Sequence, residues 1–182
     1  QLQLQPGFLG QGGFAVVLEA SYYGSPVAVK VPRMDMSSMA EETAEKSVLL
    51  PFLHELRMLR FARHPNIISF YGACITPGDM ELALVFKKVT GPTLQDFISQ
   101  CEVGSAKQWQ VRLSILVDVV QALHYLHSRQ PPMVHGDLKD SNIFVESGPK
   151  TVRGVLGDLG LARRITRTAE PMGGTRRWIA PE

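Results

Sequence analysis

The segment around residues 131–145 constrains the fold of this 182-residue chain more than any other stretch. Pro131 and Pro132 must end any helix before them, because proline lacks a backbone N–H and disfavours helical geometry in the preceding residue. Asp137, Lys139 and Asn142 then follow within six residues, between short apolar runs. This pattern predicts one rigid loop that presents a carboxylate, an ammonium and a carboxamide. Such a set can accept a proton from a hydroxyl, neutralise a phosphoryl oxygen and hold a divalent cation.

Composition narrows the class of protein and of partner. The apolar fraction of 45% is typical of a globular chain, and the net charge of +2 without blocks of like charge does not indicate a nucleic-acid partner. Two cysteines without a Cys-x-x-Cys pattern predict a reduced, intracellular (cytoplasmic) setting. The sequence has no signal peptide and no apolar run of membrane-spanning length. Both ends look like cuts, so we expect a piece of a longer protein, which can carry further domains or a membrane anchor.

The first half of the chain predicts a sheet with helices beside it. Residues 8–31 read as three strands with a glycine turn at 10–13, since strand-forming residues alternate with turn signals. We expect a short helix over 39–50 and a new helix from Pro51 to about residue 62, because proline is tolerated in a first helical turn. Strands over 67–75 and 80–86 would then complete a five-stranded antiparallel sheet.

The second half predicts mainly helices. A short helix is expected over 93–99 and a long one over 110–128, which is apolar on most sides and should therefore be largely buried. Short strands are expected over 143–145 and 152–156, and a loop over 161–175. His124 and His127 have the spacing of a metal half-site, but no third ligand is evident, so an ordinary helix end is the better interpretation.

Several short motifs, each weak alone, resemble those of protein kinases in the family's order. Residues 135–142 resemble the catalytic loop H-R-D-L-x-x-x-N, and Gly10, Gly12 and Val17 fit G-x-G-x-x-G-x-V. Residues 27–30 match V-A-I-K, residues 158–160 resemble D-F-G, and the chain closes on A-P-E. Gly136, Leu159 and Ala15 depart from the pattern without removing a reacting group. The chain most resembles the tyrosine-kinase-like branch of Ser/Thr kinases, truncated after A-P-E.

The resemblance implies an α+β, protein-kinase-like bilobal fold. Residues 1–86 would form the N-lobe, with a five-stranded antiparallel sheet and one main helix, and residues 87–91 the hinge. Residues 92–182 would form the first part of a mainly helical C-lobe, through the activation segment. Because later helices of that lobe would be missing, the long helix over 110–128 is expected to expose a large apolar surface.

The resemblance also implies a function and a site. The chain would be an ATP-dependent protein kinase that transfers the γ-phosphoryl of ATP to Ser/Thr hydroxyls of a protein substrate, with Mg²⁺ as cofactor. The implied catalytic residues are Asp137, Lys139, Lys30 and Glu55, and the metal ligands are Asn142 and Asp158. The nucleotide would be bound by Leu9, Gly10, Gly12, Val17, Ala28, Lys30, Phe86, Lys88 and Phe144.

Two alternatives stay open. The chain can be a pseudokinase, a scaffold module that binds nucleotide or partners without turnover, or a fragment that is inactive on its own. The presence of Lys30, Glu55, Asp137, Asn142 and Asp158 favours catalysis. Gly136 stands where the family's arginine meets a phosphate on the activation loop, so we hypothesise that loop phosphorylation is not needed for activity.

Overall fold

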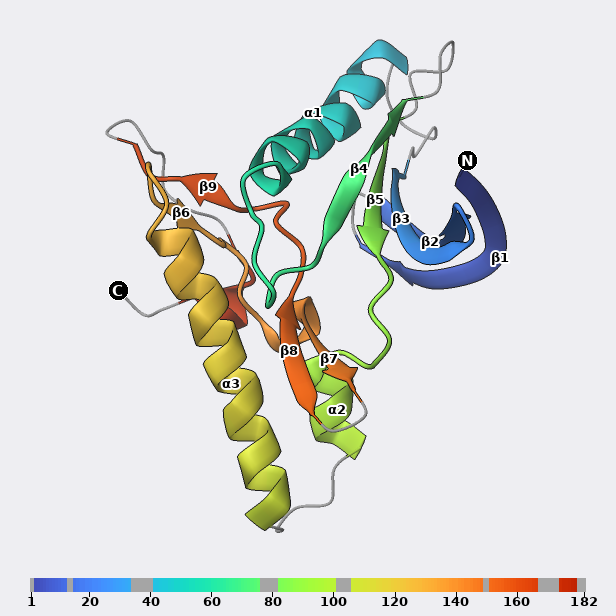
Figure 1. Ribbon diagram of the computed structural model, residues 1–182. Coiled ribbons are helices and arrows are strands. Elements are labelled where there is room, and N and C mark those ends of the chain that lie inside the picture. Colours follow the sequence, from blue (N-terminus) through green and yellow to red (C-terminus); the bar gives the residue numbers. More distant parts are fainter. Residues whose placement is uncertain are drawn as a thin grey trace. The chain divides into compact units, whose positions relative to one another are not determined.

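The computed structural model describes residues 2–12, 15–33, 41–75, 82–100, 106–148, 151–166 and 174–179, with the side chains of 41–48, 106 and 107 left aside. These residues fall into two compact units. The first unit comprises Gln1–Phe61 and Ser69–Lys88, and the second comprises Ala62–Ile68 and Val89–Glu182. Each unit is described by itself below (Figure 1).

The first unit is built on a five-stranded antiparallel sheet, as the sequence predicts. The strand order is β1-β2-β3-β5-β4, so the three N-terminal strands form a meander and β5 lies between β3 and β4 (Figure 1). Tyr23 and Gly24 join β2 to β3, and their φ angles are positive, at 48° and 80°. Positive φ at both central residues is typical of the type I′ turn, which is common in two-residue hairpin loops. The strands are β1 Leu2–Gln11, β2 Ala15–Tyr22, β3 Ser25–Pro32, β4 Phe70–Ile75 and β5 Leu82–Lys87. The predicted turn at 76–79 lies outside the described residues.

One face of this sheet carries a small apolar core. Its buried members are Ala20, Val27, Val29 and Val85, with Leu2, Val31 and Ala83 packed against them. Neighbouring residues of a strand point to opposite faces, so the residues next to these core residues in each strand belong to the other face. That other face therefore carries Ala28, Lys30 and Phe86.

Among the described residues of the first unit there is one helix, α1 Glu41–Leu59, and it has Pro51 in its interior. The prediction of two helices with a new start at Pro51 is therefore wrong. Proline in a helix removes one backbone hydrogen bond and costs about 3 kcal/mol. The burial of Phe52, Met58 and Leu59 after the proline offsets this cost, since each is at most 7% exposed and burying a large apolar side chain contributes about 1.5–3 kcal/mol.

The second unit combines helices with two small two-stranded sheets. The hairpin β7–β8 confirms the predicted strands, and β6 pairs with β9 within the stretch expected to be a loop. Two residues per strand give no periodicity that a sequence pattern could reveal. The elements are α2 Leu94–Gln100, α3 Ala106–His127, β6 Met133–Val134, η1 Asp140–Asn142, β7 Ile143–Ser147, β8 Val152–Leu156, β9 Arg163–Arg164 and η2 Arg176–Trp178.

The long helix α3 buries only one stripe of its surface. Ile115, Val119, Ala122 and Leu126 are buried, at the spacing of a single helix face. The expectation of a helix buried on most sides is therefore wrong for this chain, and the expectation of a large exposed apolar surface is confirmed. The exposed apolar residues of α3 are Trp109, Leu113, Leu116, Val117 and Val120. Among the described helices, none is both long and apolar enough to cross a membrane.

The strand β8 is held from two sides at Gly154. Its N–H donates to Asp118 Oδ2 on α3 over 2.8 Å, and its carbonyl accepts from Asn66 Nδ2 over 3.0 Å. A Cβ at this position would lie 3.0 Å from the backbone oxygen of Ile115, so the glycine permits the close approach of α3 to β8. Asn66 also accepts through its backbone oxygen from Leu156 N, which ties residues 62–68 to the second unit.

Candidate active site

In the first unit, the cross-strand register gathers most of the predicted nucleotide-binding residues on one face of the sheet. Gly10 lies opposite Val17, Val17 opposite Lys30, and Lys30 opposite Leu84. A neighbouring row runs from Glu19 through Ala28 to Phe86. Residues directly opposite each other share a face, so two adjacent rows bring together Gly10, Val17, Ala28, Lys30 and Phe86.

Lys30 is held on this face by a carboxylate from α1. Its Nζ donates to Glu55 Oε1 and Oε2 over 2.9 and 2.7 Å, and the Glu55 side chain is only 4% exposed. The bidentate contact and the burial fix both side chains, unlike a mobile surface pair. The predicted pair therefore forms, and it presents an oriented ammonium beside Val17.

The predicted glycine turn is open at its base. Gly12 donates its N–H to the backbone oxygen of Ala15 over 2.8 Å, and residues 13 and 14 lie outside the described part. A Cβ at Gly10 would meet no atom of the described residues within 4 Å, so among these residues nothing blocks a ligand from this backbone. Leu9, beside it, is 43% exposed and can contribute apolar surface.

The segment after β5 was predicted to be a hinge. Phe86 is buried and its ring lies 5.6 Å from that of Phe70. Lys88, two residues later, forms an ion pair with Glu19 of β2. The Lys88 side chain is thus attached to the sheet of the first unit.

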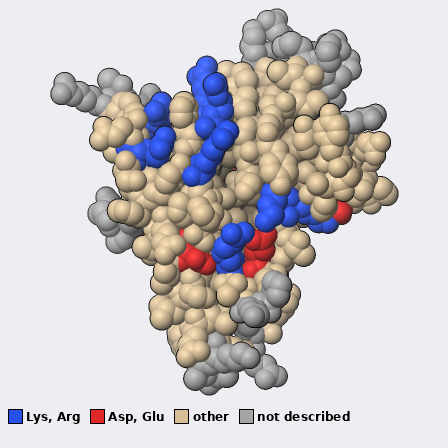
Figure 2. Space-filling model, viewed as in Figure 1, with Lys and Arg blue, Asp and Glu red and all other residues tan. Residues whose placement is uncertain are grey.

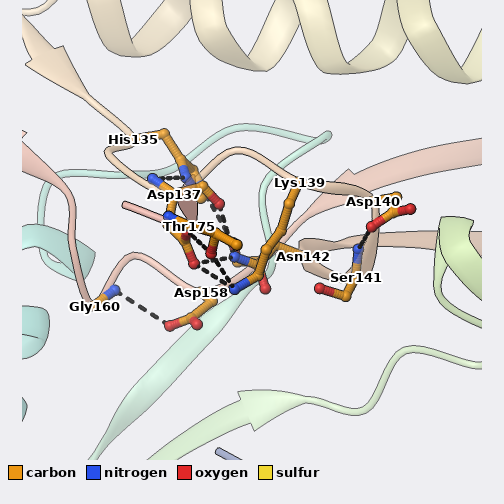
Figure 3. A network of polar contacts seen from close by, with 10 residues as sticks. His135, Asp137, Lys139, Asp140, Ser141, Asn142, Asp158, Gly160 and Thr175 are labelled. Atoms are coloured by element: carbon orange, nitrogen blue, oxygen red, sulfur yellow. Dashed lines mark hydrogen bonds and ion pairs between the residues drawn. The ribbon is translucent and has the colours of Figure 1, made fainter. Parts of the chain in front are cut away.

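In the second unit, the catalytic-loop residues form one polar network around Asp137 (Figure 3). Asp137 Oδ1 accepts from Thr175 N over 3.0 Å and from Thr175 Oγ1 over 2.6 Å. Asp137 Oδ2 accepts from Asn142 Nδ2 over 3.1 Å and pairs with Lys139 Nζ over 2.6 Å. Lys139 Nζ also donates to Thr175 Oγ1 over 3.1 Å. The structure therefore brings Asp137, Lys139 and Asn142 together as predicted and adds Thr175.

This network decides the charge of Asp137. Burial alone would raise the pKa of its carboxyl, but hydrogen bonds from Lys139 and Thr175 and the charge of Lys139 outweigh burial, and the pKa lies below its ordinary value. Asp137 is therefore a carboxylate at neutral pH. Its oxygens are acceptors only, so the group can orient an incoming hydroxyl and receive its proton.

The two predicted metal ligands lie on either side of the β7–β8 hairpin. Asn142 Nδ2 donates to the backbone oxygen of Asp137 as well as to its carboxylate, so the amide oxygen is the atom suited to a cation. Asp158 is exposed and accepts from Gly160 N over 3.3 Å, and its φ of 54° is rare for a residue other than glycine. One carboxylate and one amide oxygen fit Mg²⁺, which keeps several waters and uses few protein ligands. Within the described ranges, no cluster of three His, Cys, Asp or Glu side chains forms a separate metal site.

His135 connects the two polar segments of this unit. Its Nε2 lies 2.9 Å from the backbone oxygen of Gly157, and its Nδ1 accepts from Asp137 N over 3.3 Å. This pair of contacts requires a neutral ring with the proton on Nε2. Burial lowers the pKa of His135 and outweighs the hydrogen bond to Gly157, which alone would raise it.

Gly136 is required by the backbone of this loop. Its φ is 79°, and a Cβ there would lie 2.3 Å from the backbone oxygen of Leu161. At this position, where the family has an arginine, the backbone at Gly136 lies close to the backbone at Leu161. Phe144 of β7, predicted to line the adenine, lies opposite Val155 of β8, and its ring fills the space beside Gly157.

Thr175 and His135 are the two contributors to this site that the residue assignments from the sequence omit. Thr175 lies 38 residues after Asp137, so no local pattern connects them. The motif G-G-T-R-R-W before A-P-E is the sequence feature that indicates Thr175, because it places a hydroxyl at a fixed number of residues before the A-P-E motif.

The protein kinase domain family matches residues 5–182 of the chain. The chain belongs to the protein kinase family. A match over nearly the whole length agrees with the motif order, the five-stranded sheet and the network around Asp137, and it confirms the expected family.

Named relatives support the same family and the serine/threonine branch. Serine/threonine-protein kinase CTR1 of Arabidopsis thaliana is 34% identical over 96% of this chain and 20% of that protein. Mitogen-activated protein kinase kinase kinase 10 of Homo sapiens is 34% identical over 100% of this chain and 19% of that protein. Interleukin-1 receptor-associated kinase 1 of Mus musculus is 35% identical over 85% of this chain and 21% of that protein. The chain thus spans about a fifth of the length of these relatives, and they confirm the resemblance to the tyrosine-kinase-like Ser/Thr kinases.

Charge on the visible surface is mixed. Figure 2 shows Lys and Arg in short groups, and near the middle of that face they lie beside Asp and Glu. This arrangement agrees with the low net charge of +2 and gives no extended basic field on the face in view.

Proposed function

We propose that this chain is the catalytic part of a serine/threonine protein kinase that transfers the γ-phosphoryl of ATP to a protein hydroxyl. The observation that carries the proposal is the network around Asp137, in which Lys139, Thr175 and Asn142 hold a carboxylate at neutral pH. A carboxylate with both oxygens fixed can accept a hydroxyl proton in a defined direction. The oriented pair of Lys30 and Glu55 supports the proposal from the other unit.

In this mechanism, the chain's own residues position and neutralise charge. Asp137 orients the substrate hydroxyl and receives its proton, while Lys139 stabilises the transferred phosphoryl oxygens. Lys30, fixed by Glu55, binds phosphate oxygens of ATP. Asn142 and Asp158 would hold Mg²⁺, which neutralises phosphate charge when bound.

The base and ribose of ATP would contact the sheet face described above. Gly10, Gly12 and Lys30 would meet the phosphates, while the apolar side chains would line the adenine. On this face we assign the lining role to Leu9, Val17, Ala28 and Phe86, with the backbone at Lys88 as a hydrogen-bonding edge. We retain Phe144 of the second unit as a proposed adenine contact. We retain 1–86 as N-lobe, 87–91 as hinge and 92–182 as the first part of the C-lobe, and we propose an intracellular site of action, where ATP is supplied.

The first test is thermal unfolding with and without Mg-ATP. A ligand that binds only the folded state raises the unfolding temperature. We expect Mg-ATP to raise it in the parent chain and to have little effect on Asp158→Ala, because that variant lacks the proposed metal ligand. No response of the parent would mean that the nucleotide site is wrong, or that this stretch does not fold into a binding form by itself.

The second test is phosphoryl transfer to a mixed Ser/Thr protein substrate. Asp137→Asn should lower kcat by about 10²–10⁴-fold, the usual contribution of an acid–base group, with nucleotide affinity unchanged. Asp140→Asn is the matched control, because Asp140 lies in the same loop and its carboxylate accepts from Ser141 N, outside the hydrogen bonds described around Asp137. Nucleotide binding without turnover in the parent chain would favour the pseudokinase alternative.

A further inference from the structure

An ion pair that the kinase motifs do not account for lies next to the proposed nucleotide face. Glu19 Oε1 of β2 and Lys88 Nζ are 2.5 Å apart, and their side chains are 26% and 29% exposed. Both residues belong to the first unit. The register places Glu19 opposite Ala28 and Ala28 opposite Phe86, two residues before Lys88. The pair therefore extends the row that holds two of the proposed adenine contacts.

The neighbouring strand β1 is shaped to accommodate Glu19. The pairing of β1 with β2 shifts register between Leu4 and Phe8, and Gly7 lies in that interval. A Cβ at Gly7 would lie 2.7 Å from Glu19 Cβ and 2.8 Å from Glu19 Oε2. Only a glycine there lets the Glu19 side chain take this position without movement, so the pair is built into the sheet.

We propose that Glu19 and Lys88 are positioning residues that fix the segment after β5 against β2 and thereby raise the affinity for the nucleotide base. This inference rests on the proposed nucleotide site. Lys88 is the last residue of the first unit, and the backbone beside it is the proposed hydrogen-bonding edge for adenine. Holding this backbone before the ligand arrives lowers the ordering cost of binding.

The alternative is that Lys88 binds nucleotide phosphates directly. Its ammonium is paired with Glu19 on the row of Ala28, whereas Lys30 lies on the row of Gly10 and Val17. The two lysines therefore belong to different rows of the same face. Direct phosphate binding predicts that Glu19→Gln tightens binding, because it releases the ammonium, and the positioning role predicts that it weakens binding.

The experiment measures the dissociation constant of ADP for the whole chain by calorimetry. Glu19→Gln and Lys88→Met should each weaken binding about two- to five-fold, the range of a partly exposed ion pair. The double variant should be no weaker than either single variant, because both remove the same interaction. The charge swap Glu19→Lys with Lys88→Glu should restore the parent value to within about two-fold.

A matched control removes an ion pair elsewhere. Arg153 and Glu146 pair across the β7–β8 hairpin in the second unit, and Glu146→Gln with Arg153→Met should leave ADP affinity unchanged. In the phosphoryl-transfer assay, the Glu19 and Lys88 variants should raise KM for ATP and leave kcat unchanged.

Three outcomes would overturn the proposal. Unchanged affinity in both single variants, even with a lower unfolding temperature, would make the pair purely structural. A swap that fails to restore affinity, or tighter binding by Glu19→Gln, would favour direct phosphate contact by Lys88. Absence of ADP binding by the parent chain would instead refute the nucleotide site itself, and the two failures are distinguished by the parent measurement alone.

Discussion

Gly136→Ala should destabilise the second unit, because this glycine combines an unusual backbone angle with a close contact. Its φ of 79° is nearly that of Gly24, whose φ is 80°. A Cβ at Gly24 would meet nothing within 4 Å, whereas a Cβ at Gly136 would lie 2.3 Å from the oxygen of Leu161. The two glycines therefore separate the cost of the angle from the cost of the contact.

The expected magnitudes follow from these two contributions. Placing an L-residue in left-handed geometry costs about 1–2 kcal/mol, and this is the expected loss for Gly24→Ala. At Gly136 the Leu161 backbone must also retreat by about 1 Å to reach ordinary contact, and overpacking of this kind costs about 1–3 kcal/mol. Gly136→Ala should thus cost about 2–5 kcal/mol, and each kcal/mol lowers Tm by about 2–4 °C in a chain of this size.

Thermal unfolding checks this difference. Circular dichroism follows the whole chain, and tryptophan fluorescence follows the second unit, which contains Trp109 and Trp178, the two tryptophans of the sequence. Gly136→Asn provides a control at the same site, since asparagine tolerates left-handed geometry better but keeps the Cβ. A loss in Gly136→Ala no larger than in Gly24→Ala, or full stability of Gly136→Asn, would contradict the argument from the Leu161 contact.

Three further predictions concern the same unit. Thr175→Val removes the hydroxyl that donates to Asp137 and should lower kcat about ten-fold or more, as hydrogen bonds to charged groups contribute about 1.5–3 kcal/mol; Thr175→Ser should keep most activity, and equal losses would argue against a hydroxyl role. The pKa of His135 in the folded chain is below its unfolded value of 6.5. The unfolded chain therefore binds a proton first as the pH falls, and the free energy of unfolding should decrease below pH 6.5 by at most about 1.4 kcal/mol per pH unit. Denaturant unfolding at pH 7.5 and 5.5 should show a smaller decrease for His135→Phe than for the parent chain, and an equal decrease would exclude this ring as the cause. Thr166→Ala should remain active if loop phosphorylation is dispensable, whereas complete loss that Thr166→Glu restores would refute that hypothesis; Thr168, its neighbour in the same test, lies outside the described residues.

Local patterns in the sequence were sufficient for most of the fold. The five-stranded sheet and the β7–β8 hairpin follow from runs of strand-forming residues between turn signals, and the structure confirms them. The continuity of α1 could not be predicted, because Pro51 is equally compatible with a helix start and a helix interior until the burial of later residues is known. The pairing of β6 with β9 joins residues about thirty positions apart and leaves no local trace.

The site was predictable where a motif fixes chemistry and unpredictable where distant segments meet. Asp137, Lys139 and Asn142 lie in one loop, so their meeting follows from sequence spacing. Thr175 lies 38 residues after Asp137, so their contact does not follow from local spacing. The pairing of Lys88 with Glu19 depends on strand order, which places β5 beside β3.

The proline inside α1 affects the local opening of this helix. Position 51 has no amide hydrogen, so the carbonyl of Ser47 receives no bond from it and residues 41–50 are joined to the rest of the helix by one bond fewer. Opening of the upstream part is therefore less cooperative with the downstream part. Backbone amides before Pro51 should exchange with deuterium sooner than those from Phe52 to Leu59. Glu55 lies in the part of α1 that should exchange more slowly. The start of α1 can therefore fray while the Glu55 carboxylate stays paired with Lys30.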